Sequence, residues 1–303
     1  MRVAVIGLGN MGMGAALNLL RAEGLEVAGC DPREAARAEF AAAGGTALAR
    51  ADALPEGTQA VLVLVVNAAQ AEAALFGPEG CAPRLAPGAA LIVSATMAPE
   101  AARALAEQAA ARGLLYLDAP VSGGAVGARE GALTVMASGS AQAFDKAAPV
   151  LAAVARRVWN LGAEPGLGST MKVVHQLLAG VHIAAAAEAM ALGIRAGLDP
   201  RTLYEVVVGA AGNSWMFENR MPRVLAGDDA PRSAVDIFVK DLGLVEEMAR
   251  SFSFPALLAA QAHQLFVSAR ALGHGAKDDA FVIRAYQALS GFALPGEAGA
   301  SGG

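Results

Sequence analysis

The sequence predicts an α/β fold, in which an N-terminal doubly wound parallel sheet is followed by a long interdomain helix and an all-α C-terminal domain. In the first half, short and nearly continuous apolar runs alternate with alanine-rich helical stretches, as in βαβ units whose strands are covered on both faces. After about Leu161 the strand pattern stops, and later segments show helical periodicity broken by Gly, Pro and Asp turns. With 303 residues, the chain is long enough for two cores.

The individual elements follow from the same patterns. A Gly-Pro-rich hinge at residues 162–168 leads into a helix that we expect from residue 169 to about 196. We place the domain boundary at this hinge, which gives a sheet domain (1–163), a helical domain (164–295) and a disordered tail (296–303). The clearest expected strands cover residues 3–6, 25–30, 60–66, 90–93, 114–117 and 133–137.

Composition narrows the class of protein. The chain is 55% hydrophobic but only 5% aromatic, and its apolar excess is alanine, which favours helix. The most apolar stretch, residues 173–187, contains His175, Gln176 and His182, so it offers no clean run of about 18 apolar residues for a membrane span. The N-terminus lacks a signal-peptide pattern, which predicts a cytoplasmic protein. A net charge of -5 without a basic patch argues against nucleic acid as a partner.

No metal site is expected. Cys30 and Cys81 match no metal-ligand spacing, and we interpret both as small buried hydrophobes in a reducing compartment. The histidines are scattered, and the pair His175 and His182 lacks the tight spacing and carboxylate partner of a zinc site. We expect His182 in the core or in a packing contact.

A glycine-rich turn near the N-terminus predicts a dinucleotide site. It follows the first expected strand directly and opens a helical pattern over residues 13–22, which is the context that the motif requires. Its first glycine permits the tight turn, the second lets the backbone approach a pyrophosphate, and the third lets the helix pack on the strand. The predicted cofactor-binding residues of this turn are Gly7, Leu8, Gly9, Asn10, Met11 and Gly12.

The choice between NAD and NADP depends on the end of the second strand. Asp31 lies there, and its carboxylate can accept hydrogen bonds from the adenosine ribose and would repel a 2′-phosphate. NAD is therefore favoured. Arg33 is close enough to bind a phosphate, so NADP remains possible.

Four blocks of sequence resemble the β-hydroxyacid dehydrogenase family, which includes 3-hydroxyisobutyrate dehydrogenases and related tartronate semialdehyde and threonate enzymes. The likeness covers almost the whole chain. It implies a Rossmann-type nucleotide domain and oxidation of a small hydroxy acid. We also expect a homodimer or homotetramer, with no nucleic acid or membrane as a partner. The blocks are residues 7–12, residues 118–124 (Asp-Ala-Pro-Val-Ser-Gly-Gly), residues 166–172 (Gly-Leu-Gly-Ser-Thr-Met-Lys) and residues 240–242 (Lys-Asp-Leu).

The second and third blocks carry the expected chemistry. The resemblance implies that Ser122, Gly123 and Gly124 bind the substrate carboxylate, and exposed backbone amides beside a hydroxyl do form an anion nest. It also places the family's catalytic lysine at Lys172. Oxidation of an alcohol needs a base for the hydroxyl proton, and reduction of a carbonyl needs an acid, so one lysine can serve both directions. A helix N-terminus disfavours the ammonium form and would help Lys172 act as the base.

Other residues complete the expected site. By resemblance, Lys240 lies near the cofactor, and we expect Asp241 to orient it or to cap a helix. Val66, Asn67 and Thr96 follow expected strands, where open α/β sheets bind ligands, and the resemblance assigns them to the nicotinamide half of the cofactor.

The third block departs from the family one turn after Lys172, where many members have asparagine and this chain has His175. His175 and Gln176 share a helix face with Lys172, so both are expected to contact substrate. The run that follows resembles the L-threonate dehydrogenase branch, and a polar His-Gln pair suits a polyhydroxy acid.

Alternatives to threonate oxidation stay open. Within the enzyme class they are a 3-hydroxyisobutyrate dehydrogenase and a reductase of tartronate semialdehyde or succinic semialdehyde. In a different class, a non-catalytic dinucleotide sensor would not need Ser122, Lys172 and Lys240 together. Trp215 and Phe217 either line the substrate pocket or pack in a core or subunit contact.

Overall fold

The structure is a computed structural model that describes residues 1–297. Contacts divide the chain into two compact units, Met1–Lys172 and Val173–Gly303. This division falls inside a continuous helix, and the boundary that the sequence suggests between residues 163 and 164 stays a prediction. Most of the predicted disordered tail (296–303) lies outside the described residues. Glu297 is described, and its carboxylate accepts a hydrogen bond from the Leu294 amide at 2.9 Å.

The first unit is built on a single sheet. Its strands are β1 (Arg2–Ile6), β2 (Glu26–Cys30), β3 (Thr46–Leu48), β4 (Thr58–Val63), β5 (Leu85–Val93), β6 (Leu115–Asp118), β7 (Val121–Ser122), β8 (Leu133–Gly139) and β9 (Ala155–Asn160). Their order in space is β3-β2-β1-β4-β5-β6-β8-β7, with β9 paired to β8. The strands from β3 to β6 run parallel, as predicted. Beyond β6, β8 runs antiparallel to β6 and β9 runs parallel to β8, so this end of the sheet is mixed.

Three strands are missing from the sequence prediction. β3 and β7 span 3 and 2 residues, too short to show a periodic pattern. β9 exposes most of its side chains, so it lacks the apolar run of a covered strand. The expected strand at residues 60–66 is also corrected, because β4 ends at Val63 and the chain leaves the sheet there.

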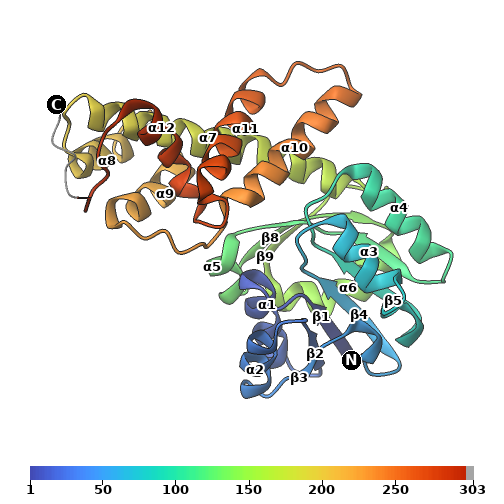
Figure 1. The fold of residues 1–303 in the computed structure, drawn as a ribbon. Helices are drawn as coiled ribbons and strands as arrows, with labels where there is room; N and C mark the ends of the chain where they lie inside the picture. Colours follow the sequence, from blue (N-terminus) through green and yellow to red (C-terminus); the bar gives the residue numbers. More distant parts are fainter. Residues whose placement is uncertain (298–303) are drawn as a thin grey trace. The chain divides into compact units, whose positions relative to one another are not determined.

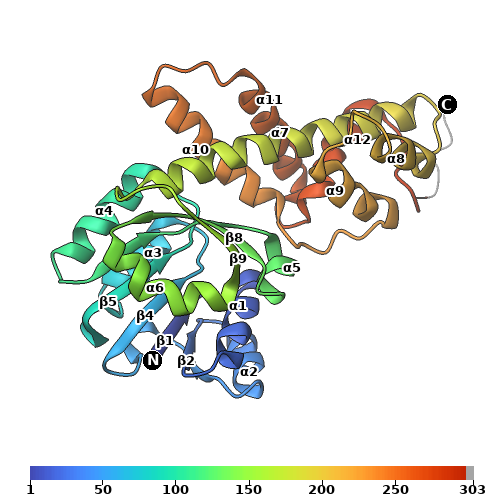
Figure 2. The ribbon, with the colours of Figure 1, turned by 180° about the vertical axis from the view of Figure 1, so that it is seen from behind.

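Helices cover both faces of this sheet, which makes it doubly wound (Figures 1 and 2). Alternate strand residues point to opposite faces. The helical segments are α1 (Asn10–Arg21), α2 (Glu34–Ala42), α3 (Ala68–Phe76), α4 (Pro99–Ala110), α5 (Gly124–Arg129) and α6 (Ala141–Val154), with short turns η1 (Ala51–Ala53) and η2 (Ala82–Arg84). Val3 and Val5 pack with α1, α2 and α6, whereas Ala4 and Ile6 pack with α3 and α4.

Both cysteines lie in the second of these layers. Cys30 and Cys81 are buried and unpaired, as the sequence predicts for small packed hydrophobes. Burial raises the pKa of Cys30 to about 11 and that of Cys81 to about 12. Neither thiol is therefore a ready nucleophile at neutral pH.

The second unit is helical, as predicted. Its helices are α7 (Leu167–Arg195, which begins in the first unit), α8 (Pro200–Val208), α9 (Trp215–Ala226), α10 (Val235–Ser251), α11 (Leu257–Ala269) and α12 (Ile283–Ser290), with short turns η3 (Arg270–His274) and η4 (Asp279–Val282). The turn signals in the sequence act as helix caps. The Asp199 side chain accepts a hydrogen bond from the Thr202 amide at the start of α8, and Gly227 ends α9 with a φ of 65°.

The long helix α7 is apolar on several sides. Over its most apolar 18-residue window the mean hydropathy is 1.8, so by length and composition it could cross a membrane. Half of that window is buried inside the protein, as expected for the core helix of a folded domain. Gly180 explains its close packing on α10, because a Cβ there would lie 2.8 Å from a methyl carbon of Leu242.

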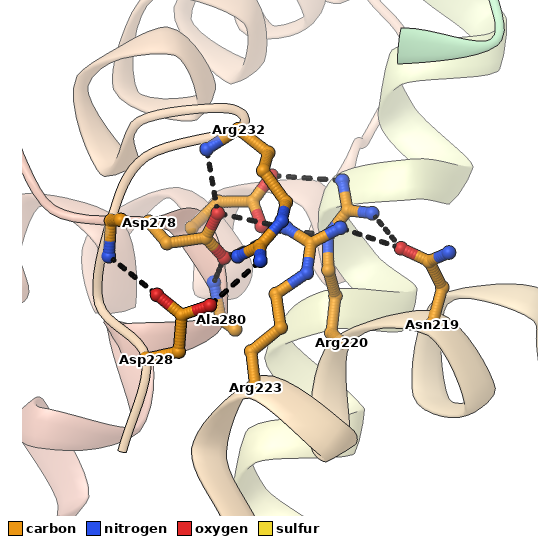
Figure 3. A network of polar contacts seen from close by, with 9 residues as sticks. Asn219, Arg220, Arg223, Asp228, Arg232, Asp278 and Ala280 are labelled. Carbon is orange, nitrogen blue, oxygen red and sulfur yellow. Dashed lines mark hydrogen bonds and ion pairs between the residues drawn. The ribbon is translucent and has the colours of Figure 1, made fainter. Parts of the chain in front are cut away.

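A buried ionic network joins α9 to the start of η4 (Figure 3). Arg220 Nε and Nη2 bind the two carboxylate oxygens of Asp279 at 2.7 and 3.0 Å, and Arg223 Nη1 binds both oxygens of Asp278 at 2.9 and 2.8 Å. Both aspartate side chains are fully buried. The Arg232 amide from the loop before α10 also donates to Asp278. The network therefore fixes three segments of the second unit.

Candidate active site

The predicted cofactor-binding residues of the first unit follow strands at one edge of the sheet. β1, β4 and β5 are parallel neighbours, so the loops that follow them leave the sheet at the same carboxyl edge. The glycine turn follows β1, Val66 and Asn67 follow β4, and Thr96 follows β5. Asn67 also caps α3, because its side chain accepts a hydrogen bond from the Gln70 amide. Its predicted cofactor role would come in addition to this structural one.

The glycine turn has the form that a bound pyrophosphate requires. A Cβ on Gly12 would lie 1.7 Å from the Gly7 carbonyl oxygen, and Gly7 itself has a φ of +91°, so both positions need glycine. At Gly9 the nearest atom to an added Cβ is 3.9 Å away, which leaves that side of the turn open. α1 starts at Asn10 without a side-chain cap or an acidic residue in its first turn, which favours an anion at this helix N-terminus. These residues fit a dinucleotide.

Asp31 follows β2 as predicted, but protein groups already engage its carboxylate. Oδ1 accepts hydrogen bonds from the Arg33 amide and Nε, and Oδ2 accepts them from the Leu8 amide and Arg33 Nη2, all at 2.9 Å. Burial raises the pKa of Asp31, but these contacts outweigh burial and hold the pKa below its ordinary value. A carboxylate has about four acceptor sites. Binding of a ribose at Asp31 therefore requires Arg33 to move.

The predicted substrate-binding turn follows the last residue of β7. Gly123 and Gly124 both have positive φ, 131° and 61°, and an added Cβ on Gly124 would meet nothing within 4 Å. Successive amides in this kind of conformation point into a shared concavity that suits an anion. Ser122, half-buried, stands directly before them. The turn can therefore offer backbone amides and a hydroxyl to one carboxylate.

This turn is tied to the glycine turn through a helix contact. An added Cβ on Gly14 of α1 would lie 2.7 Å from the Arg129 amide of α5, so the two helices touch backbone to backbone. Asn18 Nδ2 also donates a hydrogen bond to the Ala128 carbonyl at 2.7 Å. Each helix begins at one of the two turns, so their contact sets the distance between the expected cofactor and carboxylate sites. Gly14 and Asn18 are not among the residues predicted from the sequence, although the extra glycine after the motif is a signal for this contact.

Asp118, at the end of β6, anchors the start of α7. Its Oδ2 accepts hydrogen bonds from the amides of Gly166 and Ser169 at 3.0 and 2.7 Å, and its Oδ1 accepts one from Ser169 Oγ at 2.7 Å. Burial raises the pKa of Asp118 in spite of these contacts. Lys172 follows Ser169 by one helical turn and is 7% exposed. The carboxylate therefore fixes the helix segment that carries Lys172, a role that the sequence analysis does not assign.

In the second unit, four predicted polar residues form one chain of hydrogen bonds. Lys240 Nζ lies 2.5 Å from Asp241 Oδ1, as expected if Asp241 orients the lysine. Asp241 Oδ2 accepts a hydrogen bond from Gln176 Nε2 at 2.5 Å. Gln176 Oε1 lies 2.9 Å from His175 Nδ1. The close packing of α7 on α10 makes this possible, because Gln176 lies one turn before Gly180 and Asp241 lies next to Leu242.

The remaining candidates are placed differently. Phe217 is 3% exposed and stacks on Tyr204, so it belongs to the core, whereas Trp215 is 62% exposed. His182 is exposed, so the expectation of a core position is wrong, because it falls on the outward side of α7. Among residues 1–297, no three or more His, Cys, Asp and Glu side chains are grouped so as to hold a metal ion.

Comparison with known proteins identifies the family. A family profile described as the NAD binding domain of 6-phosphogluconate dehydrogenase matches residues 2–162. A second profile, described as the NAD-binding of NADP-dependent 3-hydroxyisobutyrate dehydrogenase, matches residues 166–286. The chain belongs to the β-hydroxyacid dehydrogenase family. The predicted fold class, family and NAD(P) cofactor are thereby confirmed.

Several members of this β-hydroxyacid dehydrogenase family are similar over almost the whole chain. L-threonate dehydrogenase of Cupriavidus necator is 54% identical and covers 98% of each chain. The enzyme of that name from Escherichia coli K12 is 55% identical over 97% of this chain and 96% of its own. A 3-hydroxyisobutyrate dehydrogenase of Pseudomonas aeruginosa is 37% identical over 87% and 90%. A crystal structure of 3-hydroxyisobutyrate dehydrogenase from Salmonella typhimurium is 52% identical, with a TM-score of 0.90 over 94% and 99%.

Proposed function

We propose that this dehydrogenase oxidises L-threonate at its 2-hydroxyl group to 2-dehydro-L-erythronate, with NAD as the preferred cofactor. One observation carries the choice of substrate: relatives named L-threonate dehydrogenase are 54% and 55% identical, against 37% for a relative named 3-hydroxyisobutyrate dehydrogenase. The preference for NAD rests on the carboxylate of Asp31, which would repel a 2′-phosphate once Arg33 has moved aside.

In this proposal, each part of the site has one task. The amides of Gly123 and Gly124 and the hydroxyl of Ser122 hold the substrate carboxylate, which fixes the carbon to be oxidised. The neutral amine of Lys172 takes the proton from the hydroxyl group during oxidation and returns it during reduction. The bound nicotinamide supplies the acceptor for the hydride that leaves the same carbon. The low exposure of Lys172, 7%, supports this role, because little water competes for its proton.

A second candidate substrate is 3-hydroxyisobutyrate. The crystal structure of that name is 52% identical, close to the values for the threonate enzymes. The polar pair His175 and Gln176 favours the polyhydroxy acid, because an aliphatic branch offers no group that can hydrogen-bond to a polar side chain.

The assembly is also part of the proposal. We infer a soluble cytoplasmic homodimer or homotetramer. Large apolar side chains on α7 within the second unit support an assembly, since Val174, Leu178 and Leu192 are 46, 52 and 70% exposed. Apolar surface of this kind favours a protein contact.

The test is a screen of hydroxy acids with NAD and NADP, followed by absorbance of the reduced nicotinamide. L-threonate with NAD should give the highest kcat/KM, and a higher value for 3-hydroxyisobutyrate would overturn the choice of substrate. Lys172→Ala should leave cofactor binding intact and lower kcat by about 10²–10⁴-fold. Lys172→Arg should not rescue, because a guanidinium stays protonated. If either variant keeps more than about a tenth of the wild-type kcat, another group carries the proton.

A further inference from the structure

In the hydrogen bonds that join Asp241, Gln176 and His175, the chemistry of the partners determines which group is the donor. Asp241 pairs with the ammonium group of Lys240 and is 2% exposed, so it acts as a carboxylate that only accepts hydrogen bonds. The group of Gln176 that faces it must therefore be the amide NH₂. This orientation follows from the chemistry of the contact and does not depend on telling nitrogen from oxygen in the amide.

The orientation of Gln176 then decides the proton position on His175. With its NH₂ group directed at Asp241, Gln176 presents its Oε1 to His175 Nδ1, 2.9 Å away. A carbonyl oxygen cannot donate, so Nδ1 must carry the hydrogen. In a neutral imidazole the other ring nitrogen is then an acceptor. The hydrogen bonds from Asp241 through Gln176 to His175 therefore allow only the Nδ1–H form of neutral His175.

We propose that Gln176 and Asp241 are positioning residues that hold His175 as the Nδ1–H tautomer, so that its Nε2 accepts a hydrogen bond from a hydroxyl group of the substrate. His175 thus binds a second hydroxyl group, apart from the one that is oxidised. This part of the proposal rests on the proposed function, because it takes a polyhydroxy acid as the ligand. The tautomer itself follows from the contacts of the second unit alone.

The position of His175 on α7 suits this role. It follows Lys172 by three residues on the same continuous helix, and side chains at that spacing share one face. The two side chains are therefore one helical turn apart along α7, which is the basis for the expectation that a polyhydroxy acid contacts His175. An acceptor at Nε2 selects for a donor, so a hydroxyl is accepted, whereas a methyl group or a fluorine in its place is not.

The tautomer can be measured directly. The chain has 4 histidines, so a protein labelled with ¹⁵N in its imidazoles gives few signals, and His175→Asn identifies those of His175. At a pH where the ring is neutral, long-range ¹H–¹⁵N correlation should show the Nδ1–H form in the wild type. Gln176→Met keeps the shape of the side chain and removes both hydrogen bonds, so it should give a mixed or reversed tautomer. The matched control is Gln264→Met, an exposed glutamine of α11, which should change nothing.

Steady-state kinetics then test whether the tautomer of His175 determines the choice of substrate. Wild-type kcat/KM should be roughly tenfold or more higher for L-threonate than for analogues in which the 3- or 4-hydroxyl is replaced by hydrogen or fluorine, the scale of one hydrogen bond to a buried group. For the analogue altered at one of these two hydroxyls, the ratio of kcat/KM for L-threonate to kcat/KM for the analogue should fall toward unity in Gln176→Met. In Gln264→Met this ratio should stay at its wild-type value. A purely structural role of Gln176 would lower the kcat/KM of every substrate alike and leave the ratio unchanged.

Each arm has an outcome that overturns the proposal. An Nε2–H tautomer of His175 in the wild type, or the same tautomer in Gln176→Met, shows that the chain of hydrogen bonds does not set it. If the wild type has the Nδ1–H tautomer and Gln176→Met changes the tautomer, but the ratio of kcat/KM between L-threonate and the analogues stays the same, His175 does not bind the hydroxyl. If L-threonate is not oxidised at all, the proposed function fails, and the NMR arm still decides the role of Gln176.

Discussion

Replacement of Asp118 separates hydrogen bonding from charge at the start of α7. In Asp118→Asn, the amide oxygen can keep both backbone donors, from Gly166 and Ser169. The amide NH₂ then faces Ser169 Oγ, which can rotate its hydrogen away and accept. In Asp118→Ala, all three contacts are lost. The two variants therefore differ in hydrogen bonding but share the loss of the negative charge.

The size of the effect follows from the three contacts. Each buried polar group left without a partner costs about 1–3 kcal/mol, so Asp118→Ala should lose roughly 3–9 kcal/mol, toward the lower value where water enters. A loss of 3 kcal/mol lowers Tm by at least about 6 °C for a unit of this size. Because Lys172 follows the anchored turn, we also expect kcat to fall by about 10- to 100-fold in the folded variant, the cost of a shift of about 1 Å.

Asp118→Asn should stay within a few-fold of wild-type kcat and be at least as stable at neutral pH. Burial raises the pKa of Asp118 in the folded protein, so the stability that its protonated form provides is lost as the pH rises through that pKa. The Asn variant has no such loss, and its advantage over the wild type should grow from acid to neutral pH.

The measurements are thermal unfolding across pH and steady-state turnover well below Tm. Ser138→Ala provides a comparison, because it removes the acceptor of the Gly168 amide and the Ser138 hydroxyl beside Asp118 but keeps the contacts of Asp118 with Gly166 and Ser169, so it should cost less than Asp118→Ala. If Asp118→Asn is as damaging as Asp118→Ala, the charge matters and the hydrogen bonds do not, and the reasoning fails.

Three further predictions concern other charged groups. Arg33→Ala should lower kcat/KM with NADP relative to NAD by roughly tenfold, because it removes a phosphate partner, and an unchanged ratio would contradict a role in cofactor choice. The pKa of Asp31 is lowered in the folded protein, so its stabilising contribution should be present above about pH 4 and be lost as the pH falls through the lowered pKa. Acid unfolding curves that coincide for the wild type and Asp31→Asn would refute this. Arg220→Met leaves Asp279 buried and without its bidentate partner and should cost about 3–5 kcal/mol, whereas the double variant Arg220→Met/Asp279→Leu should recover most of it. Chemical denaturation of both variants would show whether it does.

Much of the fold and part of the site are determined by the sequence alone, because their causes are local. Strand and helix periodicity gives the sheet unit, the long helix and the helical unit, and the glycine turn reveals itself by residue spacing and by the elements on either side. Gly7 and Gly12 illustrate this, since Gly7 has a φ of +91° and a Cβ on Gly12 would meet the carbonyl oxygen of Gly7, five residues earlier. Short strands such as β3 and β7 escape the same reasoning, because 2 or 3 residues carry no period.

The tertiary structure decides how the site residues are used. Asp31 is visible in the sequence, but the Leu8 amide reaches its carboxylate only once the turn and the second strand lie side by side. Asp118 anchors Ser169 across 51 positions, and Gln176 meets Asp241 across 65. No periodicity spans such separations, since partners this far apart are chosen by the packing of whole elements. The sequence thus supplied the residues of the site, and the packing of α7 on α10 and on the end of β6 gave them their orientation and protonation.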